Sequence, residues 1–557
     1  MKINSTSASI QTIWPCILIG VAVFINFSSI GIPIIGPDGT LYAFIAKTMV
    51  LRNNYIELFD HGKDWLDKPH FPFWITAFSF KCFGFKTWAY KLPGILFLMM
   101  GAIYTYLFAK DIYNKKVALW SVLILLTAQH IVLSDNDVRA EPYLTGLIIA
   151  AVYHFYIANK KSNRWHLLFG SLFTACAIMT KGMFALVPIG GAIAGHLILT
   201  RQLKALLNWR WLMAIGLILF FILPEIWCLY LQFDQHPEKV VFGQKGVSGV
   251  KFFFWDSQFG RFFNTGPIKG HGDPSFFVHT TLWAFLPWSL LLFAAAFQFI
   301  KKGIKNSQSQ EWYCMSGALL TFLLFSASKF QLPHYLNIVF PFFAIITAQY
   351  LNFVTSKKSI KAIRLTQIAI ICLMLLLILI LSYFFRPDAL TWFVSILLVF
   401  LTLTMFVLPG KVARSAMEKM IYQTLLASFT INLYLNLAFY PSLMNYQAGS
   451  KAAMWINKNN PGNLPVAQYY DDYVSAFEFY SNAPVKYIYG DGTGEINAGP
   501  FLFYAPADVV KNLEAKGWKV TVLHSFQRYW VSRLKPAFLN KRTRGKELTT
   551  MMVVLVK

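Results

Sequence analysis

Apolar stretches about as long as a membrane-crossing helix recur along most of this chain, and they constrain its fold more than any other feature. A helix needs about 20 apolar residues to cross the hydrocarbon core of a bilayer. Hydrophobic residues make up 56% of the 557 residues, and charged residues only 13%. The apolar stretches lie near residues 12–35, 88–109, 117–133, 142–158, 164–180, 182–199, 212–232, 276–300, 312–327, 335–353, 365–385, 388–409 and 420–440. We therefore expect a multi-span α-helical membrane protein with about thirteen transmembrane helices.

The two ends of the chain differ in character. The first apolar stretch lacks a small-residue cleavage site, so we expect it to be retained as a helix. The last part is polar and shows strand-like alternation at 465–470 and 519–523, with a helical stretch near 508–516. The sequence thus predicts a transmembrane domain over residues 1–440 and a small soluble α/β domain over residues 441–557.

The basic charge of the chain does not predict nucleic-acid binding. The 50 lysines and arginines outnumber the 25 acids, but they occur in short clusters between apolar stretches. Nucleic-acid binding needs one continuous basic face. The six cysteines lie in or beside apolar stretches without paired, metal-type spacing. We therefore expect no nucleic-acid partner, no disulfide framework and no thiolate metal site.

Lysine and arginine concentrate in alternate short loops, and this pattern predicts the orientation in the membrane. Loops that are rich in these residues usually lie in the cytoplasm. The clusters occur at residues 110–116, 160–164, 201–210, 301–305, 357–364 and 411–419. The N-terminus is then cytoplasmic, and an odd number of spans places residues 441–557 on the outer face.

Six polar segments fall on that outer face by the same parity, each at the end of an apolar stretch. Two longer outer segments, residues 36–87 and 233–275, are expected to build a cavity, with amphipathic interfacial helices at 40–51 and 73–83. The positive-inside rule takes no account of the six segments, so their convergence indicates one polar site. They are Pro37-Asp38-Gly-Thr-Leu-Tyr42, Trp65-Leu-Asp67-Lys68-Pro, Arg139-Ala-Glu141, Lys181-Gly, Gly-His271-Gly-Asp-Pro and Ser-Lys329-Phe-Gln-Leu-Pro-His334-Tyr335.

Taken in order, these motifs resemble the bacterial aminoarabinose (lipid A) transferase family, within the protein O-mannosyltransferase-like GT-C superfamily. The resemblance runs from about residue 14 to residue 440, whereas the C-terminal domain matches only in position and size. It implies an inverting glycosyltransferase on the periplasmic side of the inner membrane. Such an enzyme moves a monosaccharide from a polyprenyl-phosphate donor to a lipid A-like lipid or to another envelope glycan or protein. No nucleotide cofactor is implied.

The resemblance also implies roles for individual residues. An inverting transfer needs a carboxylate to take the acceptor's proton and cations to stabilise the departing phosphate. Asp38 would be the catalytic base or would orient the acceptor, and Glu141 would be a second catalytic acid. The expected substrate-binding residues are Tyr42, Lys68, Arg139, Lys181, Arg261, Lys329 and Tyr335.

The resemblance also suggests a metal site, and this sequence differs from the family pattern at three positions. Asp67 and His271 match positions that can hold zinc in this group, so zinc or another divalent metal is expected there. An ion pair or hydrogen bond between loops is the alternative, because structural zinc sites usually have four ligands. Gly39 replaces a second acid, Glu141 stands where aspartate is frequent, and His70 replaces a second proline. These departures leave the reaction type unchanged, but the sugar and the acceptor do not follow from the sequence.

Two other functional classes compete with a glycosyltransferase. A transporter or flippase of a lipid-linked saccharide usually has charged or broken segments near the bilayer midplane and two related halves. This sequence shows neither pattern clearly, and its acids gather at outer helix ends. A non-catalytic scaffold is the third class. Structural roles are the alternatives for single residues: Asp38 or Glu141 as a helix cap, and Lys181 or Lys329 as an interface anchor.

Overall fold

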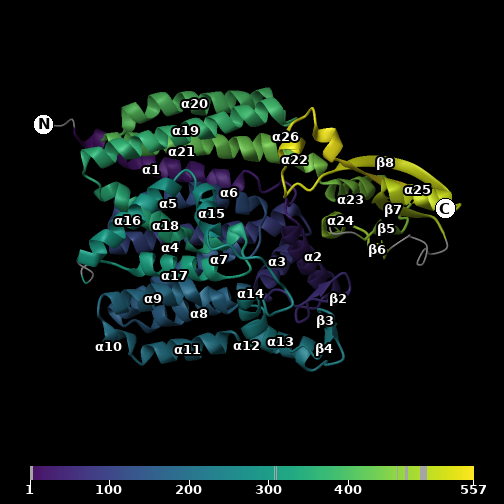
Figure 1. Cartoon of the computed structure of the whole chain (residues 1–557), viewed down its shortest axis with the longest axis horizontal. Coiled ribbons are helices and arrows are strands. Elements are labelled where there is room, and N and C mark those ends of the chain that lie inside the picture. The colour runs from purple at the N-terminus through teal and green to yellow at the C-terminus, as the bar shows by residue number, and fades with distance from the viewer. Residues whose placement is uncertain (1–3, 306–307, 309, 461, 471–473, 490–498) are drawn as a thin grey trace.

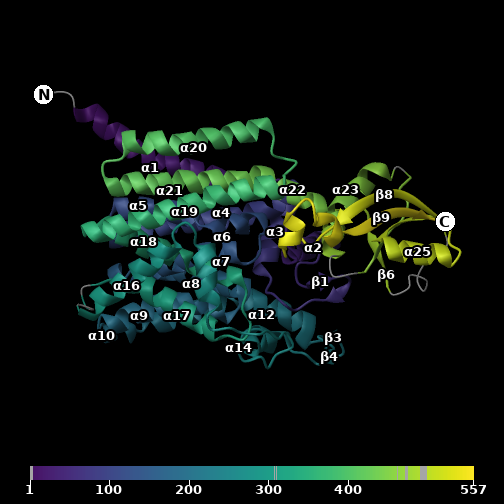
Figure 2. The ribbon, with the colours of Figure 1, turned by 45° about the horizontal axis from the view of Figure 1, so that its top comes forward.

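The computed structural model describes residues 4–305, 308, 310–460, 462–470, 474–489 and 499–557. Most of these residues are helical, and the helices up to Leu443 form one bundle (Figures 1 and 2). A sheet domain follows and lies at one end of the bundle, whereas helix α1 (Asn4–Phe27) begins near the other end (Figure 1). The molecule therefore has the expected division into a helical part and a C-terminal α/β part.

The helices of the bundle follow the apolar stretches of the sequence, and polar side chains cap several of them. Asn114 and Ser415, for example, accept hydrogen bonds from backbone N–H groups of the first turns of α5 and α21. The bundle helices are α1 (Asn4–Phe27), α4 (Thr87–Ile112), α5 (Lys115–Thr127), α6 (Gln129–Asn136), α7 (Glu141–Lys161), α8 (Arg164–Lys181), α9 (Leu186–Leu199), α10 (Leu203–Leu206), α11 (Arg210–Phe221), α12 (Leu223–Leu229), α15 (Phe276–Ala284), α16 (Ser289–Lys305), α17 (Tyr313–Ala327), α18 (Phe340–Phe353), α19 (Lys357–Phe384), α20 (Trp392–Val412), α21 (Ala416–Tyr434) and α22 (Tyr440–Leu443).

Fewer helices than predicted are long and apolar enough to cross a membrane, among those that the structure describes. Five helical segments pass this test, and a sixth passes if the pair α5 and α6, bent by 51°, is one span. The five are Thr87–Ile112, Leu203–Asp234, Pro333–Phe353, Lys357–Phe384 and Trp392–Val412. The other predicted stretches are also helical, but they are shorter or more polar. By this criterion the thirteen predicted spans reduce to five or six, and the multi-span class is confirmed.

Two segments cover the end of the bundle that faces the sheet domain. The first contains α2 (Pro37–Arg52), the hairpin β1 (Phe59–Asp60) and β2 (Lys63–Asp64), and α3 (Phe71–Phe83). The second contains the hairpin β3 (Val240–Val241) and β4 (Gln244–Lys245), α13 (Gly249–Lys251) and α14 (Phe259–Phe263). Lys239 joins the two segments through ion pairs with Glu57 and Asp64, at 3.3 and 2.9 Å. The two predicted amphipathic stretches are helices α2 and α3.

The C-terminal domain is built on a five-stranded mixed sheet. Strand β5 is parallel to β6 and β7, whereas β9 is antiparallel to β7 and β8, in the order β6-β5-β7-β9-β8. Its elements are α23 (Ala448–Asn459), β5 (Val466–Tyr469), α24 (Val474–Tyr480), β6 (Val485–Ile488), β7 (Phe501–Pro506), α25 (Ala507–Ala515), β8 (Val520–Arg528), α26 (Pro536–Leu539) and β9 (Thr549–Val556).

The sheet domain is docked on the bundle by apolar packing. Phe479, Tyr529 and Phe538 of this domain belong to the buried core of the helical bundle. Phe479 contacts the rings of Phe80 and Tyr90, which lie on α3 and α4. The domain therefore shares a core with the same end of the bundle that carries α2 and α3.

Candidate active site

Asp38 lies in the first turn of α2, where the local sequence fixes its position. Gly36 is the extended residue before the helix, and Pro37 starts it because its ring presets a helical φ. An acid in the first turn is also favoured by the partial positive charge at a helix N-terminus. The Asp38 side chain is 46% exposed, so a molecule from outside can reach it.

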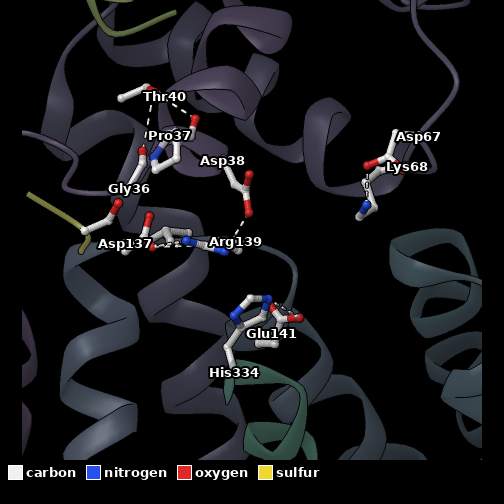
Figure 3. Close-up of polar contacts among 12 residues, drawn as sticks. Gly36, Pro37, Asp38, Thr40, Asp67, Lys68, Asp137, Arg139, Glu141 and His334 are labelled. Carbon is white, nitrogen blue, oxygen red and sulfur yellow. Dashed lines mark hydrogen bonds and ion pairs between the residues drawn. The ribbon is translucent and has the colours of Figure 1, made fainter. Parts of the chain in front are cut away.

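Arg139 connects Asp38 to a second acid, Asp137. An Arg139 guanidinium nitrogen lies 2.6 Å from Asp38 Oδ2, and Asp137 Oδ2 accepts two further hydrogen bonds from Arg139 at 2.9 and 2.6 Å (Figure 3). Burial lowers the pKa of Arg139, but Asp137 and Asp38 raise this pKa by more than burial lowers it, so the guanidinium stays charged. The planar fork of Arg139 thus fixes the Asp38 carboxylate.

Glu141 begins α7 and forms a second charged cluster. It pairs with Lys181 at the end of α8, and His334 Nε2 lies 3.7 Å from its carboxylate (Figure 3). The Lys181 ammonium also lies 3.6 Å from the centre of the Tyr335 ring, a distance typical of a cation–π contact. Three segments far apart in the sequence therefore meet at this cluster.

Asp67, Lys68 and Arg261 form a third cluster. The Asp67 carboxylate pairs with both cations, and all three side chains are at least three-quarters buried. Burial raises the pKa of Asp67, but Lys68 and Arg261 together lower it below its ordinary value. Burial and the nearby Arg261 lower the pKa of Lys68, and Asp67 only partly offsets them. The cluster therefore holds two closely spaced cations against one anion.

Tyr42 lies between the three clusters. Burial raises the pKa of its hydroxyl well above the ordinary value, and the carboxylates of Asp38, Asp67 and Glu141 raise it further. Its ring packs edge-on against Trp65 and Phe73. The Tyr42 hydroxyl therefore stays protonated and can donate a hydrogen bond.

A cleft runs from the third cluster into apolar surroundings. Cationic side chains and aliphatic or aromatic side chains both line it, which suits a molecule with an anionic group and a hydrocarbon tail. The lining residues are Leu66, Asp67, Lys68, Pro69, Leu144, Lys181, Phe184, Ala185, Glu225, Leu229, Phe252, Phe253, Ser257, Gln258, Arg261, Phe325, Ser328, Phe330, Tyr335 and Ile338. Below, "the cleft" refers to this set.

Comparisons with known proteins agree with this arrangement. Residues 67–227 match the family described as dolichyl-phosphate-mannose-protein mannosyltransferase. ArnT from Cupriavidus metallidurans, solved bound to undecaprenyl phosphate, superimposes with a TM-score of 0.74 at 16% identity, over 97% of this chain and 98% of that one. The chain has an ArnT-like GT-C fold. The expected GT-C type of fold is thereby confirmed.

Curated relatives of this protein are distant in sequence. An undecaprenyl phosphate-alpha-4-amino-4-deoxy-L-arabinose arabinosyl transferase from Edwardsiella ictaluri is 26% identical over 338 residues, which cover 59% of this chain. An uncharacterised protein from Aquifex aeolicus is 27% identical over 359 residues, 63% of this chain. The chain spans 57% and 66% of the lengths of these two relatives, less than two thirds in each case.

Most of the predicted site residues come together, and two do not. Lys329 is exposed, and the cleft is lined by its neighbours Ser328 and Phe330 instead. His271 is also exposed, whereas Asp67 is largely buried. The loop of His271 packs its glycines against the backbone of residues 328–330, which keeps this loop at the rim of the site.

The predicted metal pair does not fit the geometry. The Asp67 carboxylate is engaged by Lys68 and Arg261, so a metal ion would have to displace a cation. No group of three or more histidine, cysteine, aspartate or glutamate side chains that could hold a metal occurs in the described part of the chain. The structure favours the alternative reading, in which Asp67 forms ion pairs between loops.

Three polar residues around the site were not predicted to be site residues, although His70 was noted as a departure from the family pattern. Asp137 lies against Gly39, where an added Cβ would come within 2.8 Å of Asp137 Oδ1; a side chain in place of Gly39 would collide with it. His70 is fully buried, its Nδ1 lies 3.0 Å from Glu225, and its backbone N–H, which a proline would lack, donates to the same carboxylate at 2.9 Å. The side-chain amide of Gln258 donates to the Lys181 carbonyl at 2.9 Å. Asp137 stands beside Arg139 in the sequence and could have been found; the other contacts join distant segments.

Proposed function

We propose that this protein is an inverting glycosyltransferase that takes a monosaccharide from a polyprenyl-phosphate donor. The observation that carries the proposal is the combination of an accessible carboxylate, Asp38, held by Arg139, with a cleft that offers cations and apolar side chains together. A lipid-linked sugar phosphate needs both kinds of surface, because its phosphate is anionic and its chain is hydrocarbon.

The donor phosphate would bind at Lys68 and Arg261, with its lipid chain along the apolar part of the cleft. Arg261 presents a planar fork that suits phosphate oxygens, and Lys68 presents a compact charge. Lys181 and Tyr335 lie at the same cleft and would contact the phosphate or the sugar. The Tyr42 hydroxyl, which stays protonated, would donate a hydrogen bond to either group.

The chemical step follows from these positions. Asp38 takes the proton of the acceptor hydroxyl as the acceptor oxygen attacks the anomeric carbon. The bond between that carbon and the phosphate oxygen breaks, and the phosphate leaves with the electron pair. Lys68 and Arg261 stabilise its growing negative charge. Attack opposite to the leaving group inverts the configuration of the sugar.

The proposed setting is the periplasmic side of the inner membrane, with the N-terminus in the cytoplasm. The loops that carry Asp38, Asp67, Glu141 and Lys181 lie at the end of the bundle that holds the sheet domain, as Figure 1 shows for α2 and α3. The proposed acceptor is a lipid A-like lipid or another envelope glycan or protein. It would approach Asp38 from the side of the C-terminal domain.

Transfer by the purified full-length protein tests the proposal. Radiolabelled polyprenyl-phosphate sugars would be incubated with extracted envelope lipids and proteins, and Asp38→Asn would be compared with wild type. A positioned general base typically contributes a factor of about 10² to 10⁴, so transfer by Asp38→Asn should fall by that amount.

Asp273→Asn is the matched control, because Asp273 is an exposed acid of the outer segments whose carboxylate accepts hydrogen bonds from Ser275, two residues away. It should transfer at the wild-type rate. Equal activity of Asp38→Asn and wild type would remove Asp38 from the base role. No product from folded wild-type protein with any donor would favour a transporter of lipid-linked saccharides.

A further inference from the structure

The chain just before Asp38 is held by the C-terminal domain, although more than 400 residues separate the two in sequence. The Ile34 backbone N–H donates to the Tyr480 hydroxyl at 3.0 Å. The side-chain amide of Gln447 donates to the carbonyl oxygens of Ile34 and Ile35, at 2.8 and 3.2 Å. Both backbone hydrogen-bonding groups of Ile34 are therefore satisfied by one domain.

A second contact holds the body of α2. The buried Lys47 ammonium donates to three carbonyl oxygens at the end of α24, those of Glu478, Phe479 and Ser481, at 2.9, 3.0 and 2.6 Å. The last carbonyls of a helix lack partners within the helix, and a cation is favoured there. Helices α2 and α24 lie in direct contact (Figure 1). The segment from Ile34 to Lys47 is thus fixed at both ends.

Ile34 transmits this restraint to the catalytic turn. Its side chain is fully buried, and an added Cβ on Gly39 would come within 2.7 Å of Ile34 Cγ2. Gly39 directly follows Asp38, so a shift of Ile34 would move the first turn of α2. An error of about 1 Å in the position of a catalytic group can cost a factor of 10² in rate.

We propose that Gln447 and Tyr480 are positioning residues for Asp38, so that the C-terminal domain is part of the catalytic machinery of the transmembrane domain. This inference rests on the proposed transferase function. If the C-terminal domain moves away from residues 34 and 35, the rate of the chemical step should therefore change. Gln447 and Tyr480 act through the backbone of residues 34 and 35 and do not touch the reacting atoms.

The experiment uses full-length protein in detergent and the variants Gln447→Met and Tyr480→Phe. Both roughly keep side-chain size. Gln447→Met removes the hydrogen bonds to the Ile34 and Ile35 carbonyls, and Tyr480→Phe removes those from the Ile34 N–H and the Thr87 hydroxyl. Hydrogen–deuterium exchange should rise in peptides that cover residues 30–42. The kcat for transfer should fall by about tenfold or more. The KM for the donor should stay within about twofold, because the cations of the cleft are not part of these contacts.

Arg544→Lys is the matched control for weaker docking of the same domain. Arg544 is buried and donates to the Phe385 carbonyl at 2.8 Å, just after α19, and to the Tyr446 hydroxyl at 2.7 Å. Within the described part of the chain it makes no hydrogen bond or ion pair with residues 34–47. It should lower the unfolding temperature and leave both the exchange of residues 30–42 and kcat unchanged.

The outcomes separate this inference from the function on which it rests. Unchanged exchange in Gln447→Met, or raised exchange with wild-type kcat, overturns the positioning role alone. Equal losses of kcat in Arg544→Lys and Gln447→Met also overturn it, because weaker docking of the whole C-terminal domain would then explain both losses. Wild-type protein that transfers no sugar overturns the proposed function itself.

Discussion

Arg261 and Lys329 were both predicted to bind the donor phosphate, but their surroundings differ. Arg261 is largely buried, pairs with Asp67 and lines the cleft, whereas Lys329 is exposed. A hydrogen bond to a charged group contributes about 1.5–3 kcal/mol, and about 1.4 kcal/mol corresponds to a factor of ten in affinity. We expect Arg261→Gln to weaken binding of a polyprenyl phosphate by about 10- to 100-fold.

Lys329→Gln provides the comparison for this measurement and should bind within about twofold of wild type, since surface charges contribute little. Direct binding of radiolabelled polyprenyl phosphate to the purified proteins would measure both. Similar losses of affinity in the two variants would mean that Lys329 contacts the phosphate and that the binding cleft extends as far as the loop of Lys329.

The sequence was informative about individual residues where a segment carried its own signal. Asp38 was identified from its place after a Gly-Pro turn, and Arg139 and Glu141 from their place before an apolar helix. The partner of each residue was harder to predict, because pairs such as Glu141 with Lys181 and His70 with Glu225 join distant helices. Exposure was not predictable either: Lys329 lies in a site motif, yet its side chain leaves the site.

At the scale of elements, the turn into α2 depends on the small size of Gly36. An added Cβ would come within 2.3 and 2.4 Å of the two carboxylate oxygens of Asp137. Asp137 would have to move, and Arg139 and Asp38 would move with it. Overpacking of this kind costs about 1–3 kcal/mol. Gly36→Ala should therefore destabilise the protein and lower transfer by about tenfold or more.

Gly31 lies in the same connection, and an added Cβ there meets nothing within 4 Å. Gly31→Ala should keep wild-type stability and activity. Thermal unfolding and transfer rates of the two variants, measured side by side, test the role of the turn. A Gly36→Ala protein as active as Gly31→Ala would show that Asp137 moves freely.

The contact between β1 and α24 should make docking of the domains depend on pH. His61 pairs with Asp60 and, at 2.8 Å, with Glu478. Burial lowers the pKa of His61, but these carboxylates raise it more, from 6.5 to about 9. Because the folded pKa is raised, this stabilisation is complete below pH 6.5 and is lost as the pH rises through about 9.

Lys47 acts in the opposite direction, because burial lowers its pKa from 10.5 to about 8. Keeping the buried ammonium charged costs folding free energy below about pH 8, and this cost falls only as the pH rises above that value. The unfolding temperature of wild type should therefore fall between pH 6.5 and pH 8. His61→Gln should show a flatter profile over this interval. Parallel profiles for the two proteins would contradict a charged His61 in the folded state.

At the scale of the whole molecule, membrane orientation is the least constrained property. The last residues of α19 contact the C-terminal domain through the Phe384 carbonyl and the Lys541 N–H, so Lys357 starts this helix at the opposite end. We expect a membrane-impermeant maleimide to label Lys245→Cys in intact cells, in a background without native cysteines. Lys358→Cys should react only after permeabilisation, and the reverse pattern would place the site in the cytoplasm.

The fold was predictable where periodicity is local. The helical stretches and the α/β character of the last part followed from apolar runs and alternation. The strand order was not predictable, because β5 pairs with β6 and β7, and β9 lies between β7 and β8. The number of spans was overestimated because apolar stretches of 15 to 21 residues also form helices inside the bundle, such as α7 and α17.

The spread of the site along the chain has a consequence for biosynthesis. Asp38 and Arg139 emerge early from the ribosome, Tyr335 emerges much later, and Gln447 and Tyr480 come last. Under the proposed function, a nascent chain arrested before the C-terminal domain has been made would hold a lipid phosphate in the cleft but would lack the contacts that fix Asp38. Competence for transfer would then be acquired only when synthesis is nearly complete, and truncated products would occupy donor lipid without consuming it.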